Sequence, residues 1–167
     1  MRRKRPASDY VRSSFFGIED SLVSTTGLIA GVAVGTQDPK LVILAGVVGV
    51  AVEAVSMAAG EFLSEETTQD LAGSSKGKKR TSPLLGGFIM LISYGLAGMV
   101  PLLPIMFVQG SMALPASMAA ALVGLFLLGL VKGTITDKSP LRSGIEVLVV
   151  GGIAATIGII VGVTLKI

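Results

Sequence analysis

The chain has 167 residues, of which 51% are hydrophobic and only 15% are charged, and its mean hydropathy is +0.78. Soluble domains carry about 25% charged residues, so this composition excludes an ordinary soluble protein and indicates a membrane protein. The sequence contains no cysteine and no histidine, which excludes disulfides, thiolate metal sites and imidazole chemistry. Any ion chemistry must therefore use carboxylates, hydroxyls, methionine sulfur or backbone carbonyls.

Five apolar runs follow one another along the chain, and each is long enough to cross a bilayer core of about 30 Å. They predict an all-α membrane protein with a single transmembrane domain over residues 1–167. The expected helices cover residues 15–36, 41–70, 83–107, 114–131 and 142–165. A short basic linker, residues 72–82, joins the second helix to the third. Pro101 and Pro104 predict a kink in the third helix.

The basic residues predict the orientation of these helices. Most of them precede the first helix, lie in the 72–82 linker, or flank the connection between the fourth and fifth helices. In a five-helix protein these segments share one side of the membrane, and the other side holds only Lys40 and Lys166. The positive-inside rule then places the N-terminus in the cytoplasm and the C-terminus outside. Basic clusters beside a membrane helix indicate topology, so we expect no nucleic-acid partner.

Glycines recur at a spacing that lets helices approach closely in lipid. Gly27, Gly31 and Gly35 lie four residues apart on the first helix, and Gly158 and Gly162 do so on the fifth. The spacing leaves two alternatives open. This face packs either against another helix of the same chain or across the two-fold axis of a homodimer.

Two carboxylates are expected inside the bilayer, where ionisable groups are costly and usually functional. The uncharged run after Asp20 spans only about 24 Å, so the first helix must draw Asp20 below the surface, with Ser24 one turn further on the same face. The alternative is a carboxylate that caps the helix at the interface. Glu53 lies about 18 Å into the second helix, near the bilayer centre. We expect it to be protonated or ion-bound there, the alternative being a purely structural hydrogen bond.

A stripe of polar residues runs along one face of the second helix. Glu53, Met57, Glu61 and Glu65 recur every four residues, the spacing that keeps side chains on one helix face. Met57 and Asp20 each lie about 24 Å from the outer surface, so they are expected to meet at the same depth. The predicted metal path is formed by Asp20, Glu53, Met57 and Glu61, with weaker contributions from Ser24, Glu65 and Glu146.

The ligand chemistry favours labile divalent ions. Carboxylate with thioether is a borderline set that suits iron(II) and manganese(II). Met90 and Met99 on the third helix are weaker candidates, because methionine in a membrane helix usually fills space. Glu146 follows Arg142 by four residues, which favours a salt bridge. No nucleotide or hydrolase motif is present, so we expect neither an enzyme nor a bound cofactor.

Several segments resemble the vacuolar iron transporter (VIT) family. The first helix carries GIEDSLVSTTGLIAG at residues 17–31, and the second carries EAVSMAAGEFLS at residues 53–64. Further landmarks match in order: SPL at 82–84, PLLP at 101–104, KG at 132–133 and SPLRSGIE at 139–146. The resemblance covers residues 17–167, and the motif in the second helix is quite specific.

The resemblance implies a five-helix homodimer with a metal path at the subunit interface. It implies export of iron(II) or manganese(II) from the cytoplasm, coupled to protons, with Asp20 and Met57 as transport residues and Glu53 and Glu61 as helix-two carboxylates. Family members often carry a glutamate-rich cytoplasmic domain between the second and third helices. This chain has only its basic linker there, so it resembles a short member without that domain. Ser21 stands where the family usually has glycine.

These features predict a transporter of divalent transition-metal cations that exports iron(II) or manganese(II) in exchange for protons. Its partners would be the metal, protons, the lipid membrane and a second copy of the chain. The alternatives are a small proton-coupled exporter of organic cations, which the 5% aromatic content disfavours, and a non-transporting scaffold, which Glu53 disfavours. We expect a multi-pass protein of the cell membrane in a prokaryote or of a vacuole-like organelle in a eukaryote.

Overall fold

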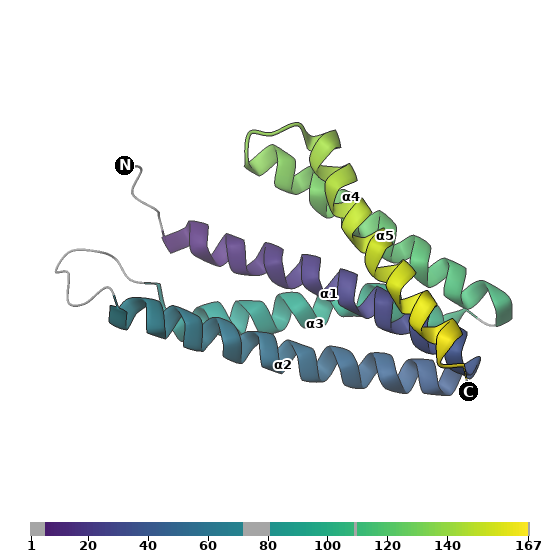
Figure 1. Cartoon of the computed structure of the whole chain (residues 1–167). Helices are drawn as coiled ribbons and strands as arrows, with labels where there is room; N and C mark the ends of the chain where they lie inside the picture. Colours follow the sequence, from purple (N-terminus) through teal and green to yellow (C-terminus); the bar gives the residue numbers. More distant parts are fainter. Residues whose placement is uncertain (1–5, 72–80, 109, 167) are drawn as a thin grey trace.

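The computed structural model describes residues 6–71, 81–108 and 110–166, which form five long α-helices and one short 3-10 helix (Figure 1). In chain order they are α1 (Pro6–Thr36), α2 (Pro39–Leu71), α3 (Pro83–Phe107), η1 (Gly110–Met112), α4 (Ala113–Ile135) and α5 (Pro140–Thr164). All five α-helices are long and apolar enough to cross a membrane. The predicted all-α membrane fold is confirmed.

The helix boundaries follow hydropathy except where polar residues extend a helix beyond its apolar run. α1 begins at Pro6 instead of near residue 15, and α4 continues to Ile135 instead of ending near residue 131. The added turns of α1 are held by contacts that hydropathy does not report. The Ser13 hydroxyl donates to Glu61 on α2, and the backbone N–H of Ser82 donates to the Tyr10 hydroxyl. Most of the expected basic linker, residues 72–80, lies outside the described residues.

α3 runs through both of its prolines as one helix. Each proline lacks a backbone N–H and so removes one helical hydrogen bond. The Ser117 hydroxyl of α4 donates to the carbonyl oxygen of Pro101 at 2.6 Å, which joins α4 to α3 at this level. The helix is therefore continuous here, and the kink stays a prediction.

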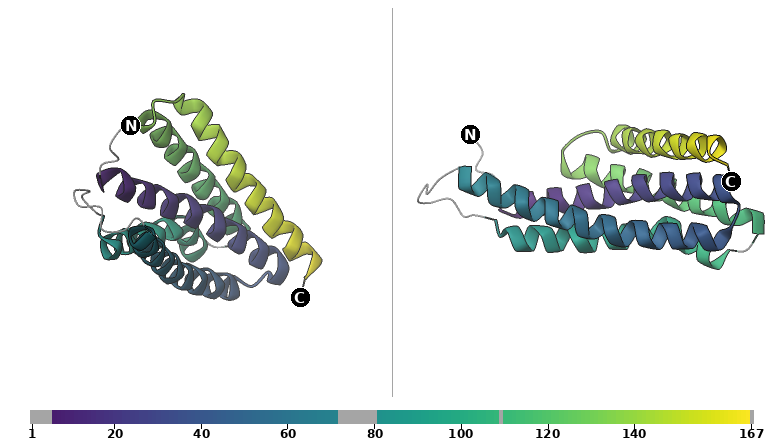
Figure 2. Two further views of the ribbon diagram at one scale, coloured as in Figure 1. Left: turned by 60° about the vertical axis from the view of Figure 1, so that its left-hand side comes forward. Right: turned by 60° about the horizontal axis from the view of Figure 1, so that its bottom comes forward.

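α1 lies at the centre of the bundle, because it packs against each of the other four α-helices. Within the described residues, α2 contacts only α1 and α3, while α5 contacts only α1 and α4. The most apolar 18-residue windows of α1 and α3 are each 39% buried inside the chain, compared with 22% for α2, α4 and α5. The helices α2, α4 and α5 therefore leave most of these residues outside the core of the chain. Figure 2 shows α4 and α5 side by side at one side of the bundle.

Successive helices run in opposite directions, and this arrangement brings most of the described basic residues to one end of the bundle. The first residues of α1, α3 and α5 and the last residues of α2 and α4 lie at one end of the bundle (Figure 1). α5 ends at the opposite end. Arg12, Lys132, Lys138 and Arg142 mark the first end. Only Lys40 and Lys166 are basic at the second, among the residues that the structure describes.

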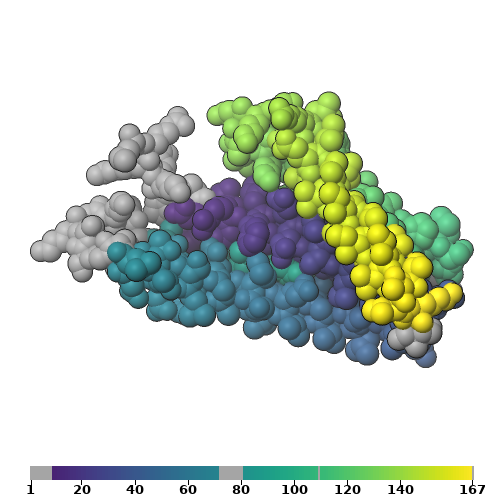
Figure 3. All heavy atoms as spheres, viewed as in Figure 1, coloured from purple at the N-terminus to yellow at the C-terminus, as the bar shows by residue number. Residues whose placement is uncertain are grey.

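The glycine face of α1 packs against α5 of the same chain. A Cβ atom added to Gly31 would lie 2.9 Å from the carbonyl oxygen of Gly158, and one added to Gly35 would lie 3.3 Å from that of Gly162. Backbones this close leave no room for a side chain. The expectation of close packing is confirmed, but the homodimer alternative for this face is wrong because α5 already occupies it. The last turns of α5 lie against the end of α1 (Figure 3).

Candidate metal path through the helix bundle

Hydroxyl groups from two neighbouring helices hold the Glu53 carboxylate of α2. The Ser24 hydroxyl of α1 donates to Glu53 Oε2 at 3.0 Å, and the Tyr94 hydroxyl of α3 donates to the same oxygen. The two hydroxyl oxygens lie 2.7 Å apart. Each hydroxyl carries one proton, so an ionised Glu53 leaves two protons for three contacts. Both of these protons are used in the bonds to Oε2.

Tyr94 was missed by the sequence reasoning, although it completes this cluster. Its relative exposure is 0%, and the buried Ser21 hydroxyl donates to its backbone carbonyl oxygen at 2.7 Å. Tyr94 lies about 16 Å from the start of α3 at 1.5 Å per residue. A phenol at mid-depth in a helix without charged residues was the signal that could have identified it.

Asp20 lies half-buried on α1, one turn before Ser24. It interacts electrostatically with the carboxylates of Glu53 and Glu19. Within the described part of the chain, no hydrogen bond or ion pair reaches Asp20, whereas Glu19 pairs with Lys132 of α4 at 3.1 Å. The Asp20 carboxylate therefore accepts no hydrogen bond from a described residue.

Met57 is half-buried on α2, one turn beyond Glu53 and one turn before Glu61. This position keeps its thioether on the same helix face as the two carboxylates. The equal depth of Met57 and Asp20 stays a prediction.

Glu61 lies near the more basic end of the bundle and is already partnered. It accepts a hydrogen bond from the Ser13 hydroxyl at 2.5 Å, and the Arg12 guanidinium lies 3.9 Å away. The Glu61 side chain is 17% exposed and that of Arg12 is 67% exposed. A cation that reached Glu61 from this end would compete with the charge of Arg12.

Glu65, a weaker candidate, connects the end of α2 to the residues just before α3 through hydrogen bonds. It accepts hydrogen bonds from the Thr81 hydroxyl and from the Gln69 side-chain amide, the latter at 3.0 Å. Gln69 also donates to the carbonyl oxygen of Thr81 at 2.7 Å. These bonds give Glu65 a structural role at this end of the bundle.

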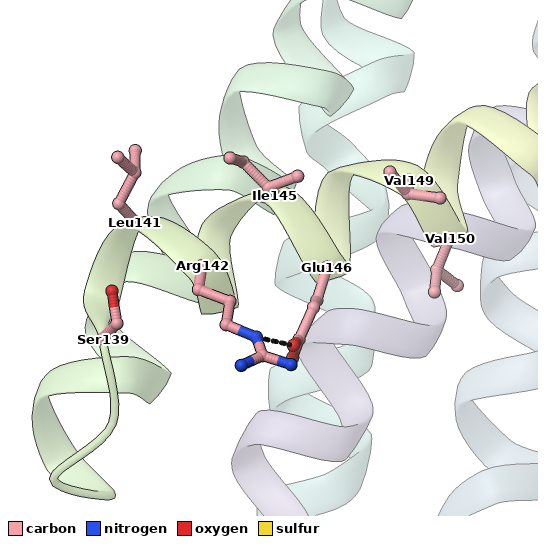
Figure 4. Close-up of a pocket in the computed structure, with 7 residues that line it drawn as sticks. All are labelled: Ser139, Leu141, Arg142, Ile145, Glu146, Val149 and Val150. Carbon is pink, nitrogen blue, oxygen red and sulfur yellow. Dashed lines mark hydrogen bonds and ion pairs between the residues drawn. The ribbon is translucent and has the colours of Figure 1, made fainter.

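Glu146 forms the predicted ion pair with Arg142, with 3.1 Å between Oε1 and Nε. Both side chains are exposed, and both line an open groove on the outer surface of α5 with Leu141, Ile145 and Val149 (Figure 4). The salt-bridge interpretation of Glu146 is confirmed. The structure does not bring Glu146 to the Glu53 cluster.

Met90 and Met99, the weaker methionine candidates on α3, have different surroundings. Met90 is 1% exposed and packs against Gly17, where an added Cβ would lie 2.9 Å from its sulfur. Met99 is 36% exposed on the surface of the bundle. Both positions fit space-filling roles.

The candidate residues form successive positions and not a single coordination sphere. Among the described residues, no three Asp or Glu side chains lie close enough together to hold one metal ion. Glu53 and Glu61 are separated by about 12 Å along α2. The structure brings together Asp20, Ser24 and Glu53 with Tyr94, and it places Glu61 two turns nearer the basic end.

Comparison of the sequence with known proteins identifies the family of this chain. The sequence matches the model of the VIT family over residues 11–82 and 71–163, which include all four principal candidates. The chain belongs to the VIT family. Among similar proteins of this family, vacuolar iron transporter homolog 3 of Arabidopsis thaliana is 32% identical over 161 residues, covering 90% of this chain and 80% of that protein. Vacuolar iron transporter homolog 1 of the same plant is 30% identical with the same coverage.

A longer relative differs by an insertion. Vacuolar iron transporter 1 of Arabidopsis thaliana is 25% identical over 208 aligned positions, which cover 89% of this chain and 83% of that protein. The alignment is longer than the 167 residues of this chain, so the relative carries inserted residues. This agrees with the interpretation of the chain as a short VIT-family member.

Proposed function

We propose that this VIT-family chain transports iron(II) or manganese(II) across a membrane, exporting the ion from the cytoplasm in exchange for protons. The observation that carries the proposal is Glu53, a carboxylate held at mid-depth of the bundle by hydroxyls of α1 and α3, with the Asp20 carboxylate nearby. Ionisable groups at such positions in membrane proteins mark ion pathways. The similar proteins named vacuolar iron transporters support iron as the substrate.

The order of the candidates along the helices suggests the path of the ion. The end of the bundle that carries Arg12, Lys132, Lys138 and Arg142 would face the cytoplasm by the positive-inside rule. An ion from that side meets Glu61 first, then Asp20 and Met57, and then Glu53. Oxygen ligands with one thioether bind iron(II) and manganese(II) weakly enough for the ion to move on.

Proton exchange follows from the same carboxylates, because each can bind either a proton or a metal ion. The Ser24 and Tyr94 hydroxyls that donate to the ionised Glu53 carboxylate could also accept a hydrogen bond from its protonated form, because a hydroxyl is both donor and acceptor. Loss of the metal and gain of a proton are therefore coupled at this position. Such competition supports antiport without a histidine relay.

The same proposal includes a homodimer in a lipid membrane. α2 leaves a continuous apolar surface outside the chain, including Leu44, Val48, Val52 and Val55, which suits lipid or a second copy. The membrane would be that of a vacuole-like organelle in a eukaryote, as the names of the relatives suggest, or the cell membrane in a prokaryote.

Flux measurements on the purified protein test this function. Proteoliposomes should take up iron(II) and manganese(II), and a pH-sensitive dye should report proton movement in the opposite direction. Proton movement driven by organic cations but not by metals would favour an organic-cation exporter. Absence of any flux above protein-free liposomes would favour a scaffold.

A further inference from the structure

Tyr94 stands out from its surroundings as the polar side chain of α3 that reaches Glu53. α3 contains no charged residue, and within the described residues α2 packs only against α1 and α3. The groups that face Glu53 are therefore Ser24 and Asp20 from α1 and Tyr94 from α3. Both hydroxyls bond the same carboxylate oxygen, Oε2. No hydrogen bond from a described residue reaches Oε1.

We propose that Tyr94 is a positioning residue for metal binding, which together with Ser24 holds Glu53 Oε2 and leaves Oε1 to bind the cation. The inference rests on the proposed transport of a divalent metal. It adds a residue of α3 to a path that the sequence assigned to α1 and α2.

The surroundings of Tyr94 suit a rigid donor. Its side chain is fully buried, and its backbone carbonyl accepts the hydrogen bond from Ser21 of α1. A phenol whose ring is locked by packing presents its hydroxyl at a fixed point, and groups held in place in this way reduce the entropy lost when a ligand binds. Without the two hydroxyls, the Glu53 side chain would sample several rotamers, and fixing one of them on metal binding would lower the affinity for the metal.

Removal of the hydroxyl alone tests the inference. Tyr94→Phe keeps the ring and its packing, so the protein should fold. Kinetics of manganese(II) uptake into proteoliposomes should show a KM raised by about tenfold, the low end for loss of a hydrogen bond to a charged group. Vmax should stay within about twofold, because the metal ligands themselves remain. A variant that folds and keeps the wild-type KM would overturn the inference.

Variants at Ser24 provide a second, independent arm. Ser24→Ala removes the other donor and should also raise KM, whereas Ser24→Thr keeps the hydroxyl and should restore it. If Tyr94→Phe does not fold, the difference in KM between Ser24→Ala and Ser24→Thr tests the positioning role alone. Equal KM values for these two variants would contradict it. Tyr10→Phe is the matched control, because the Tyr10 hydroxyl accepts the Ser82 N–H at the end of the bundle.

A binding measurement separates this inference from the proposed function. If the wild type takes up neither manganese(II) nor iron(II), the transport proposal fails. Equilibrium titration of purified wild type, Tyr94→Phe and Ser24→Ala with manganese(II) then tests the positioning role alone. A dissociation constant raised in both variants supports it, and equal dissociation constants, or no binding by the wild type, contradict it.

Discussion

Ser24 on α1 donates a hydrogen bond to Glu53 on α2 across 3.0 Å, deep within the length of both helices. The contact joins two residues that are 29 positions apart and lies one helical turn from Asp20. Helix association in lipid does not require a carboxylate, because small residues pack helices together without one. The cost of placing Glu53 here is one reason for proposing that it binds an ion or a proton.

Met57→Leu should change metal selectivity more than stability. Leucine keeps nearly the same volume, so packing should be little affected, but the soft thioether is lost. Uptake of iron(II) should become less efficient by about tenfold, or about 1.4 kcal/mol, while any magnesium(II) uptake should change little. Competition assays in proteoliposomes measure this ratio, with Met99→Leu on the exposed surface of α3 as the control. An unchanged ratio would remove Met57 from the path.

Gly31→Leu should unfold the interface between α1 and α5. The added side chain meets the backbone of Gly158, which cannot give way as a flexible side chain can. We expect a loss of about 3 kcal/mol, measured as a lower apparent Tm in detergent. Gly152→Ala on α5 is the matched control, since a Cβ there meets nothing within 4 Å. Wild-type stability of Gly31→Leu would argue against this helix pair.

The topology can be tested with single cysteines, because the natural chain has none. Lys138 lies beyond α4, and Ser111 lies before it at the opposite end, and both are exposed. With an impermeant thiol reagent, Lys138→Cys should be labelled only from the cytoplasmic side and Ser111→Cys only from the other. Labelling of both from one side would be incompatible with α4 as a membrane-spanning helix.

The sequence predicts the parts of the structure that depend on local composition. The lengths of the five apolar runs identify the helices, and the distance of Glu53 from the start of its run gives its depth. The ion pair between Arg142 and Glu146 follows from their spacing on one helix. Each of these features needs only the geometry of a single helix.

The remaining features depend on which helices pack together. A lone tyrosine in an apolar helix has no periodic signal, so the partnership of Tyr94 with Glu53 emerges only when α3 lies against α2. The glycine spacing of α1 indicates a close neighbour but cannot distinguish α5 of the same chain from a second copy. Likewise, the partners of Glu61 come from polar turns of α1 that lie beyond its apolar run.

The most direct test of the proposed path is iron(II) uptake into proteoliposomes, with simultaneous recording of internal pH, for wild type, Asp20→Asn and Glu53→Gln. Both substitutions remove a charge at nearly constant shape. Glu19→Gln is the matched control, because Glu19 pairs with Lys132 and its loss should leave flux intact. We predict metal-driven proton movement in wild type and Glu19→Gln, no iron(II) flux in Asp20→Asn, and blocked or proton-uncoupled flux in Glu53→Gln. Wild-type iron(II) and proton fluxes in both Asp20→Asn and Glu53→Gln would contradict the proposed path.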